Sequence, residues 1–215
     1  MHGLVNPALF AQRRNVGKRT TAVGSIVVST LTDASANITT PNYIEWLTLD
    51  NFANGSADDH KSGSTVITGP TLTNMTRSAG PGAFTTYNWT DGTVNATSSL
   101  TGTAAYAITT GSSIGYIDFT VPASTTSHTA TFLVGTYVNG YASAAQVVRF
   151  TLSDGSYAEQ VVTPAQNLSA YGRVYTYYQV VYNSADNSSR TLRLRFENTP
   201  GDNTWVQYVR LVTYV

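Results

Sequence analysis

Residues 114–137 (IGYIDFTVPASTTSHTATFLVGTY) constrain the fold most, because they contain two β-strand patterns with a turn between them. The first pattern is rich in β-branched and aromatic residues, with Asp118 as its one charge. Pro122 is expected to end that strand, since proline donates no hydrogen bond to a ladder. Residues 123–127 are small and polar, as is typical of a turn. Residues 129–137 follow as a second strand. Phe132, Val134 and Thr136 are expected on one face, and Thr131, Leu133 and Tyr137 on the other.

Similar short patterns recur along the rest of the chain, separated by Gly, Pro, Asn and Asp. Asp91-Gly92 and Asp154-Gly155 are strong turn signals. No amphipathic helix of useful length is visible outside the first residues. We therefore predict an all-β fold, an antiparallel β-sandwich of jelly-roll type spanning residues 24–215. The other expected strands are 25–31, 43–49, 66–77 (as one or two strands), 84–89, 104–109, 145–152, 159–163, 174–182, 191–197 and 205–215.

The composition supports a surface rich in hydroxyl and amide groups. Only 11% of the residues are charged, whereas 41% are hydrophobic, which is enough to build a core. We expect the three tryptophans, Trp46, Trp89 and Trp205, to fill that core. The chain has no cysteine, which excludes disulfides, zinc–thiolate sites, iron–sulfur clusters and thiol catalysis. No apolar run is long enough to span a bilayer, so we expect no membrane span.

Charge is spread unevenly, although the net charge is zero. Residues 1–23 form an extended arm with four basic residues and no acid, which leaves the remainder of the chain acidic. A basic arm on a mildly acidic body often seeks an anionic neighbour. We expect the arm to dock on another protein chain, while the acidic body argues against a nucleic-acid groove. The residues expected to anchor it are Phe10, Arg13, Arg14, Lys18 and Arg19.

A second interpretation of this region stays open. Arg13-Arg14, followed by the apolar residues 22–31 and by Ala34-Ser35-Ala36, loosely resembles a twin-arginine signal. The apolar part is short and is interrupted by Gly and Ser, which favours a strand over residues 25–31 instead.

Several segments resemble, in order, a galactose-binding-like jelly-roll module of secreted bacterial multidomain proteins. They cover roughly residues 36–215 and leave the arm unmatched. The resemblance implies the fold, and it implies that loop ends can bind glycans or that the module serves as a spacer. Two positions of this chain depart from the pattern of that module. The module usually has an Asp before its Trp, where this chain has Glu45 before Trp46. It usually has an Arg or Asn near its lysine, where this chain has His60. The matching segments are 44–46 (IEW), 60–63 (HKSG), 87–93 (YNWTDGT), 119–123 with 129–137, and 152–156 (LSDGS).

Tyrosines are the main candidate binding residues. The chain has 14, and several fall close together in one strand pattern. Exposed aromatic side chains stack on sugars and dominate protein interfaces, whereas buried ones only pack. Both alternatives stay open for Tyr171, Tyr175, Tyr177 and Tyr178.

Residues 50–59 (DNFANGSADD) are the densest group of oxygen ligands, with Asp50, Asn54, Asp58 and Asp59 as a weak candidate site for structural calcium. The alternative is a polar loop in which these side chains cap turns. No other cofactor is expected. His2, His60 and His128 lack metal-ligand spacing, and we expect His128 in a hairpin turn. The chain has only three glutamates, Glu45, Glu159 and Glu197, and nothing marks two of them as a catalytic pair.

Three functions follow as hypotheses. The first is a non-enzymatic structural protein of a large assembly, a capsid decoration or tail component of a bacteriophage virion. In that case its partners are other protein subunits and we expect a homo-oligomer. The second is a carbohydrate-binding module of a secreted bacterial protein that recognises a cell-surface glycan. The two are compatible, since a virion decoration can also carry a weak glycan site. The third is an enzyme, for which the sequence offers no coherent active site.

Overall fold

The structure, a computed structural model of the 215-residue chain, is described for ten stretches of sequence. The arm residues 1–21, including Phe10, Arg13, Arg14, Lys18 and Arg19, lie outside the described residues, as do Asp50, Asn54 and Tyr171. The described stretches are residues 22–31, 43–49, 58–79, 87–93, 98–100, 105–109, 114–138, 146–165, 172–198 and 206–215.

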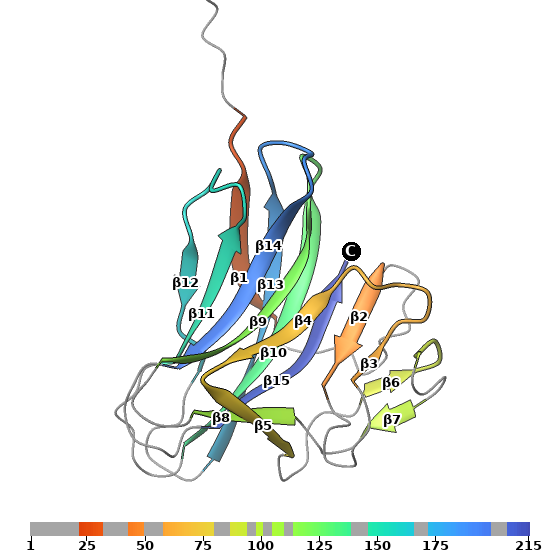
Figure 1. The fold of residues 1–215 in the computed structure, drawn as a ribbon, viewed down its shortest axis with the longest axis vertical. Helices are drawn as coiled ribbons and strands as arrows, with labels where there is room; N and C mark the ends of the chain where they lie inside the picture. The colour runs from red at the N-terminus through yellow and green to blue at the C-terminus, as the bar shows by residue number, and fades with distance from the viewer. Residues whose placement is uncertain are drawn as a thin grey trace, which may run out of the picture.

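The larger sheet has eight antiparallel strands (Figure 1). Its main path runs, in spatial order, through β1 (Ser25–Leu31), β13 (Gly172–Asn183), β10 (His128–Val138), β15 (Val206–Tyr214), β2 (Glu45–Thr48) and β3 (Asp59–His60). Off this path, β8 (Ala105–Thr109) pairs with both β15 and β5 (Met75–Ala79).

The smaller sheet has five antiparallel strands and packs against the first. A separate two-stranded ribbon joins β6 (Tyr87–Trp89) to β7 (Ser98–Leu100). The spatial order of the five strands is β12 (Gln160–Val162), β11 (Gln146–Leu152), β14 (Arg190–Asn198), β9 (Gly115–Ala123) and β4 (Thr68–Thr73).

The core between the sheets follows from strict alternation in the strands. Every second residue of β9 is buried, from Gly115 to Ala123, and the same pattern runs through β11. The buried side chains are mostly Val, Leu, Ile and Phe, with Phe119 and Phe132 in edge-to-face contact across the two sheets. The predicted β-sandwich is therefore confirmed, while its jelly-roll connectivity and the domain boundary at residue 24 stay predictions.

A second, smaller core lies on the other side of the larger sheet. Leu47 of β2 faces the inter-sheet core, so its neighbour Trp46 points to the opposite face. There Trp46 contacts Trp89 of β6, with ring centroids 5.2 Å apart, and the cluster also includes Leu133 and Tyr177. Part of this sheet is thus buried on both faces. Trp46 and Trp89 are buried, as expected, but they lie in this second core and not in the core between the sheets, where the sequence predicts them. Trp205 lies outside the described residues.

Two predictions about residues 114–137 are wrong. Pro122 does not end its strand, since β9 continues to Ala123 with Pro122 opposite Thr191 of β14. The pairing of β4 with β9 reaches only Thr120, so no strand needs a donor from Pro122 on that side. Nor does His128 sit in a hairpin turn: it begins β10, and β9 and β10 belong to different sheets.

Among the described residues there is no helix, and hence none long and apolar enough to cross a membrane. Residues 25–31, which a signal-like interpretation assigns to an apolar run, form β1 and pair along their whole length with β13. The strand interpretation of these residues is confirmed.

Candidate functional site

An open groove of about 670 Å³ lies where the two sheets end on the same side of the sandwich. One wall is β1, the last strand of the larger sheet, and the other is β12 with the residues that follow it (Figure 1). The sequence predicts both strands, but it does not predict that both lie at sheet edges or that they face each other.

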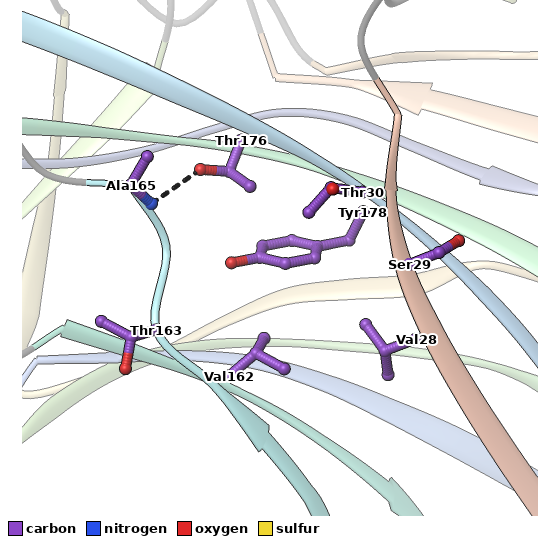
Figure 2. A pocket seen from close by; sticks show the side chains of 8 residues that line it. All are labelled: Val28, Ser29, Thr30, Val162, Thr163, Ala165, Thr176 and Tyr178. Carbon is purple, nitrogen blue, oxygen red and sulfur yellow. Dashed lines mark hydrogen bonds between the residues drawn. The ribbon is translucent and has the colours of Figure 1, made fainter.

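The groove is lined by uncharged residues. Apolar side chains form its floor, and hydroxyl groups surround them (Figure 2). The segment after β12 is held by a hydrogen bond of 2.9 Å, in which Ala165 N–H donates to Thr176 Oγ1. The eight lining residues are Val28, Ser29, Thr30, Val162, Thr163, Ala165, Thr176 and Tyr178.

Tyr178 crosses the groove between its two walls. Its ring lies between Thr30 and Thr176 on one side and Val28 and Val162 on the other (Figure 2). Only 2% of the residue is exposed, and its ring meets Phe150 of β11 edge to face. This position closes off the inter-sheet core at the edge.

The hydroxyl of Tyr178 is buried and has no hydrogen-bond partner among the described protein atoms. Burial raises the pKa of Tyr178 to about 12, and the nearby Thr176 hydroxyl, which lies outside hydrogen-bonding geometry, opposes this rise. A buried donor without an acceptor costs about 1–3 kcal/mol. An acceptor brought into the groove by an occupant would remove this cost.

The other predicted tyrosines do not join Tyr178. Strand alternation sends Tyr177 and Tyr175 to the opposite face of the larger sheet, in or against the Trp46–Trp89 cluster. Tyr177 is 6% exposed and donates a hydrogen bond of 3.2 Å to Thr131 Oγ1. Burial raises the pKa of Tyr177 to about 12, and the bond to Thr131 opposes this rise. Because Tyr177 and Tyr178 are buried, they do not form an exposed surface for stacking on a sugar, and the packing alternative describes them.

Three of the five segments that carry the jelly-roll resemblance, residues 44–46, 60–63 and 87–93, meet at the opposite edge of the sandwich. Trp46 Nε1 donates to Asp91 Oδ1 at 3.1 Å, and Lys61 N donates to the Trp46 carbonyl at 3.0 Å. Thr93 N donates to the His60 carbonyl at 2.8 Å. We call this group of contacts the closed edge. The side chains and backbone groups of these segments hold the turns of the closed edge together. The sequence alone does not show that the segments lie next to one another.

Asp59, one of the calcium candidates, belongs to the closed edge. It is 1% exposed, and its Oδ1 accepts backbone hydrogen bonds of 3.0 Å from His60 and from Thr93. No group of three or more His, Asp or Glu side chains in the described part of the chain is arranged to hold a metal. Asp59 therefore caps two turns, while the calcium site, for which Asp50 and Asn54 lie outside the described residues, stays a prediction.

The three glutamates all have partners inside the protein. Glu45 is buried, accepts a hydrogen bond of 2.6 Å from Ile67 N, and lies 3.6 Å from His60 Nδ1. Glu159 and Glu197 lie on the outer face of the smaller sheet, where both accept hydrogen bonds from Arg149.

A second pair of opposite charges lies on the same outer face. Arg195 donates two hydrogen bonds, of 2.7 and 2.6 Å, to the carboxylate of Asp118 in the neighbouring strand. Its guanidinium lies 3.5 Å from the centre of the Tyr116 ring. One face of this aromatic ring is thus covered by Arg195.

No protein-family model matches the chain, and no curated protein is similar enough to count as a relative. The functional argument therefore depends on the residues and geometry of this chain alone.

Proposed function

We propose that the protein is a non-enzymatic structural component of a large assembly, in which the sandwich is a rigid body and residues 1–23 form the anchoring arm. A capsid decoration or tail component of a bacteriophage virion is the assembly that we favour. Its partners are then neighbouring protein subunits, including further copies of this chain.

The observation that carries the proposal is the unprotected edge strand β1. Sheets of monomeric proteins guard their edges with charges, prolines, bulges or very short strands. β1 has seven residues, no charge and no proline, and its register with β13 is unbroken. Val27 is 61% exposed on this strand. An edge of this kind is suited to pairing with another strand.

The position of the arm adds a second argument. Residues 1–21 join the described chain at Ala22, three residues before β1 begins. A basic segment therefore starts next to the edge that is best suited to association. Many weak contacts of this kind, repeated around an assembly, would give high avidity.

The carbohydrate-binding alternative has less support. Of the tyrosines named for it, Tyr177 and Tyr178 are buried and Tyr175 is partly buried. Tyr116, on the outer face of the smaller sheet, has one face of its ring covered by Arg195. The carbohydrate-binding alternative would gain support if the full chain bound to a glycan array and lost this binding when an exposed residue was substituted.

Size-exclusion chromatography with light scattering tests the proposal. We expect the full chain to self-associate and a chain beginning at Ala22 to be a folded monomer, with circular dichroism as the control for folding. Identical monomers in both cases would contradict an assembly role of the arm among copies of this chain. A gene beside capsid or tail genes would support the virion as the assembly.

A further inference from the structure

We propose that the groove between β1 and β12 receives residues 3–11 of a second copy of the chain, bound as an extended strand. This inference rests on the proposed function, because it names the surface on which the arm docks.

The shape of the site favours a strand. β1 pairs with β13 on one side, and on its other side the described part of the chain places no strand. The groove opens on this side, between β1 and the segment after β12 (Figure 2). An added strand would pair with the backbone groups of β1 that no strand among the described residues uses, and it would cover the gap between the two sheets. Pro7 has no N–H, so its nitrogen would have to face away from β1.

The chemistry of the lining matches residues 3–11. None of the eight lining residues is charged, and they combine apolar side chains with hydroxyl groups. Residues 3–11 (GLVNPALFA) are nine uncharged residues with Leu4, Val5, Leu9 and Phe10 as apolar side chains. An extended peptide presents such side chains together with backbone donors and acceptors, whereas the basic residues begin only at Arg13.

The buried hydroxyl of Tyr178 is the independent sign of an occupant. It has no partner among the described atoms and points toward the side of the groove formed by Thr163 and Ala165 (Figure 2). A backbone carbonyl of an added strand would supply the missing acceptor. The bond from Ala165 to Thr176 holds the segment carrying Thr163 and Ala165 in place, so an occupant would have to displace this segment to reach the Tyr178 hydroxyl.

The direction of the chain favours a second copy over the same copy. Ala22–Gly24 enter β1 at Ser25, whereas the groove is lined by Val28, Ser29 and Thr30 farther along the strand. Gly24 is fixed at this entry, since a Cβ atom there would collide with Ser156, Leu152 and the Asn183 carbonyl. The arm would have to reverse to reach its own groove. Residues 12–21 can span at most about 35 Å, which is enough to reach a neighbour.

Disulfide trapping on the full chain tests the site, because the protein has no cysteine of its own. The test protein carries Ala8→Cys in the arm and Thr30→Cys in the groove. The control carries Ala8→Cys and Thr71→Cys; both threonines are exposed on an edge strand, but Thr71 lies on β4 at the opposite edge.

Under mild oxidation we expect the Thr30→Cys protein to form disulfide-linked dimers and larger species about tenfold faster than the control, because docking raises the local concentration of the two thiols. Equal rates in the two proteins would overturn the inference. A crosslink within one monomer would also overturn it, since the arm would then occupy its own groove.

Light scattering of the same samples under reducing conditions separates the two proposals. If the proteins self-associate but Thr30→Cys crosslinks no faster than the control, the groove is not the docking site of the arm. The proposed assembly role is not contradicted by that result. Absence of self-association contradicts both.

Tyr178→Phe gives a second readout without cysteines. Loss of its hydroxyl is expected to weaken self-association about threefold to tenfold, the range for one hydrogen bond. Tyr177→Phe, on the opposite face of the same strand, is the matched control and should leave self-association unchanged. Equal effects of the two substitutions would overturn the role of Tyr178.

Discussion

At the edge formed by β3 and β4, which is the closed edge, side chains and turns are joined by a network of hydrogen bonds. At the edge formed by β1 and β12, the sandwich ends in an open groove. The closed edge ties β2, β3 and the turn after β6 together through Trp46, Asp59 and Asp91. It also links the larger sheet to the segment before β4, where Glu45 accepts a hydrogen bond from Ile67.

The open edge has the opposite character. Its lining carries no charge, and the hydroxyl of Tyr178 has no hydrogen-bond partner among the residues that the structure describes. Buried polar groups are normally satisfied within one chain, as at the closed edge. The difference teaches that the polar groups of the closed edge are hydrogen-bonded within the chain. The open edge keeps an uncharged groove, which is the surface that we propose for a partner.

The largest expected effect on the free energy of unfolding comes from a substitution at the closed edge. Trp46→Ala removes a fully buried ring that contacts Trp89 and donates to Asp91. We expect a loss of about 3–5 kcal/mol in the free energy of unfolding, measured by urea denaturation. Val28→Ala at the open edge, where the side chain is half-buried, should cost only about 1 kcal/mol. Similar losses for both would remove the distinction between the edges.

The next effect concerns the buried carboxylate of the closed edge. Asp59→Ala removes the acceptor of the His60 N–H and one of the two acceptors of the Thr93 N–H, which keeps the His60 carbonyl, and we expect a loss of about 1–3 kcal/mol. Asp59→Asn keeps an oxygen in place and is the control, which should retain most of the stability. The same denaturation experiment with and without calcium checks the assignment: a calcium-dependent rise in stability that Asp59→Asn abolishes would contradict the capping role.

A smaller effect compares two adjacent hydroxyls. Tyr177→Phe removes a hydrogen bond to Thr131 and should cost about 0.5–1.5 kcal/mol in the monomer. Tyr178→Phe removes a hydroxyl that has no hydrogen-bond partner in the described part of the chain, so the monomer should keep or slightly gain stability. Thermal unfolding of dilute protein measures both. A clear destabilisation by Tyr178→Phe would show that its hydroxyl is already satisfied and would contradict the account of the open edge.

The smallest effect lies at neither edge, at the start of the central strand β10. Burial holds the pKa of His128 below its ordinary value of 6.5, and a bond with the backbone of Val215 opposes this only in part. The unfolded chain thus binds the proton more readily, so the contribution of His128 to stability is full above pH 6.5. It is lost as the pH falls below 6.5 toward the folded-state value.

His128→Gln is the comparison for this prediction. The difference in free energy of unfolding between the protein and this variant should shrink as the pH is lowered through this window. A difference that stays constant, or grows, would contradict the depressed pKa.

The sequence predicts much of the fold because alternation is a local property. The patterns of residues 114–121, 146–152 and 191–197 depend on neighbours two positions apart, and the corresponding strands β9, β11 and β14 are present. The turn at Asp154-Gly155 is also confirmed, with Gly155 at a positive φ of 63°. Pairing partners are not local, which is why the expected hairpin at His128 is wrong.

The candidate site was harder to predict for the same reason. Adjacent tyrosines in one strand look like a cluster in the sequence, yet alternation sends Tyr177 and Tyr178 to opposite faces. A strict period of two over residues 177–182 would have separated them. That β1 and β12 are edge strands on one side depends on the order of both sheets, which no local pattern encodes.

Hydrogen–deuterium exchange of the full chain, at concentrations where it is associated and where it is dissociated, tests the central claim most directly. The account predicts that β1 and residues 160–165 gain protection on association, while residues 59–62 and 91–93 of the closed edge do not change. If the chain associates and exchange at β1 does not change, the proposal that β1 is the association edge is contradicted. New protection confined to the outer face of β9, β11 and β14 would contradict it as well.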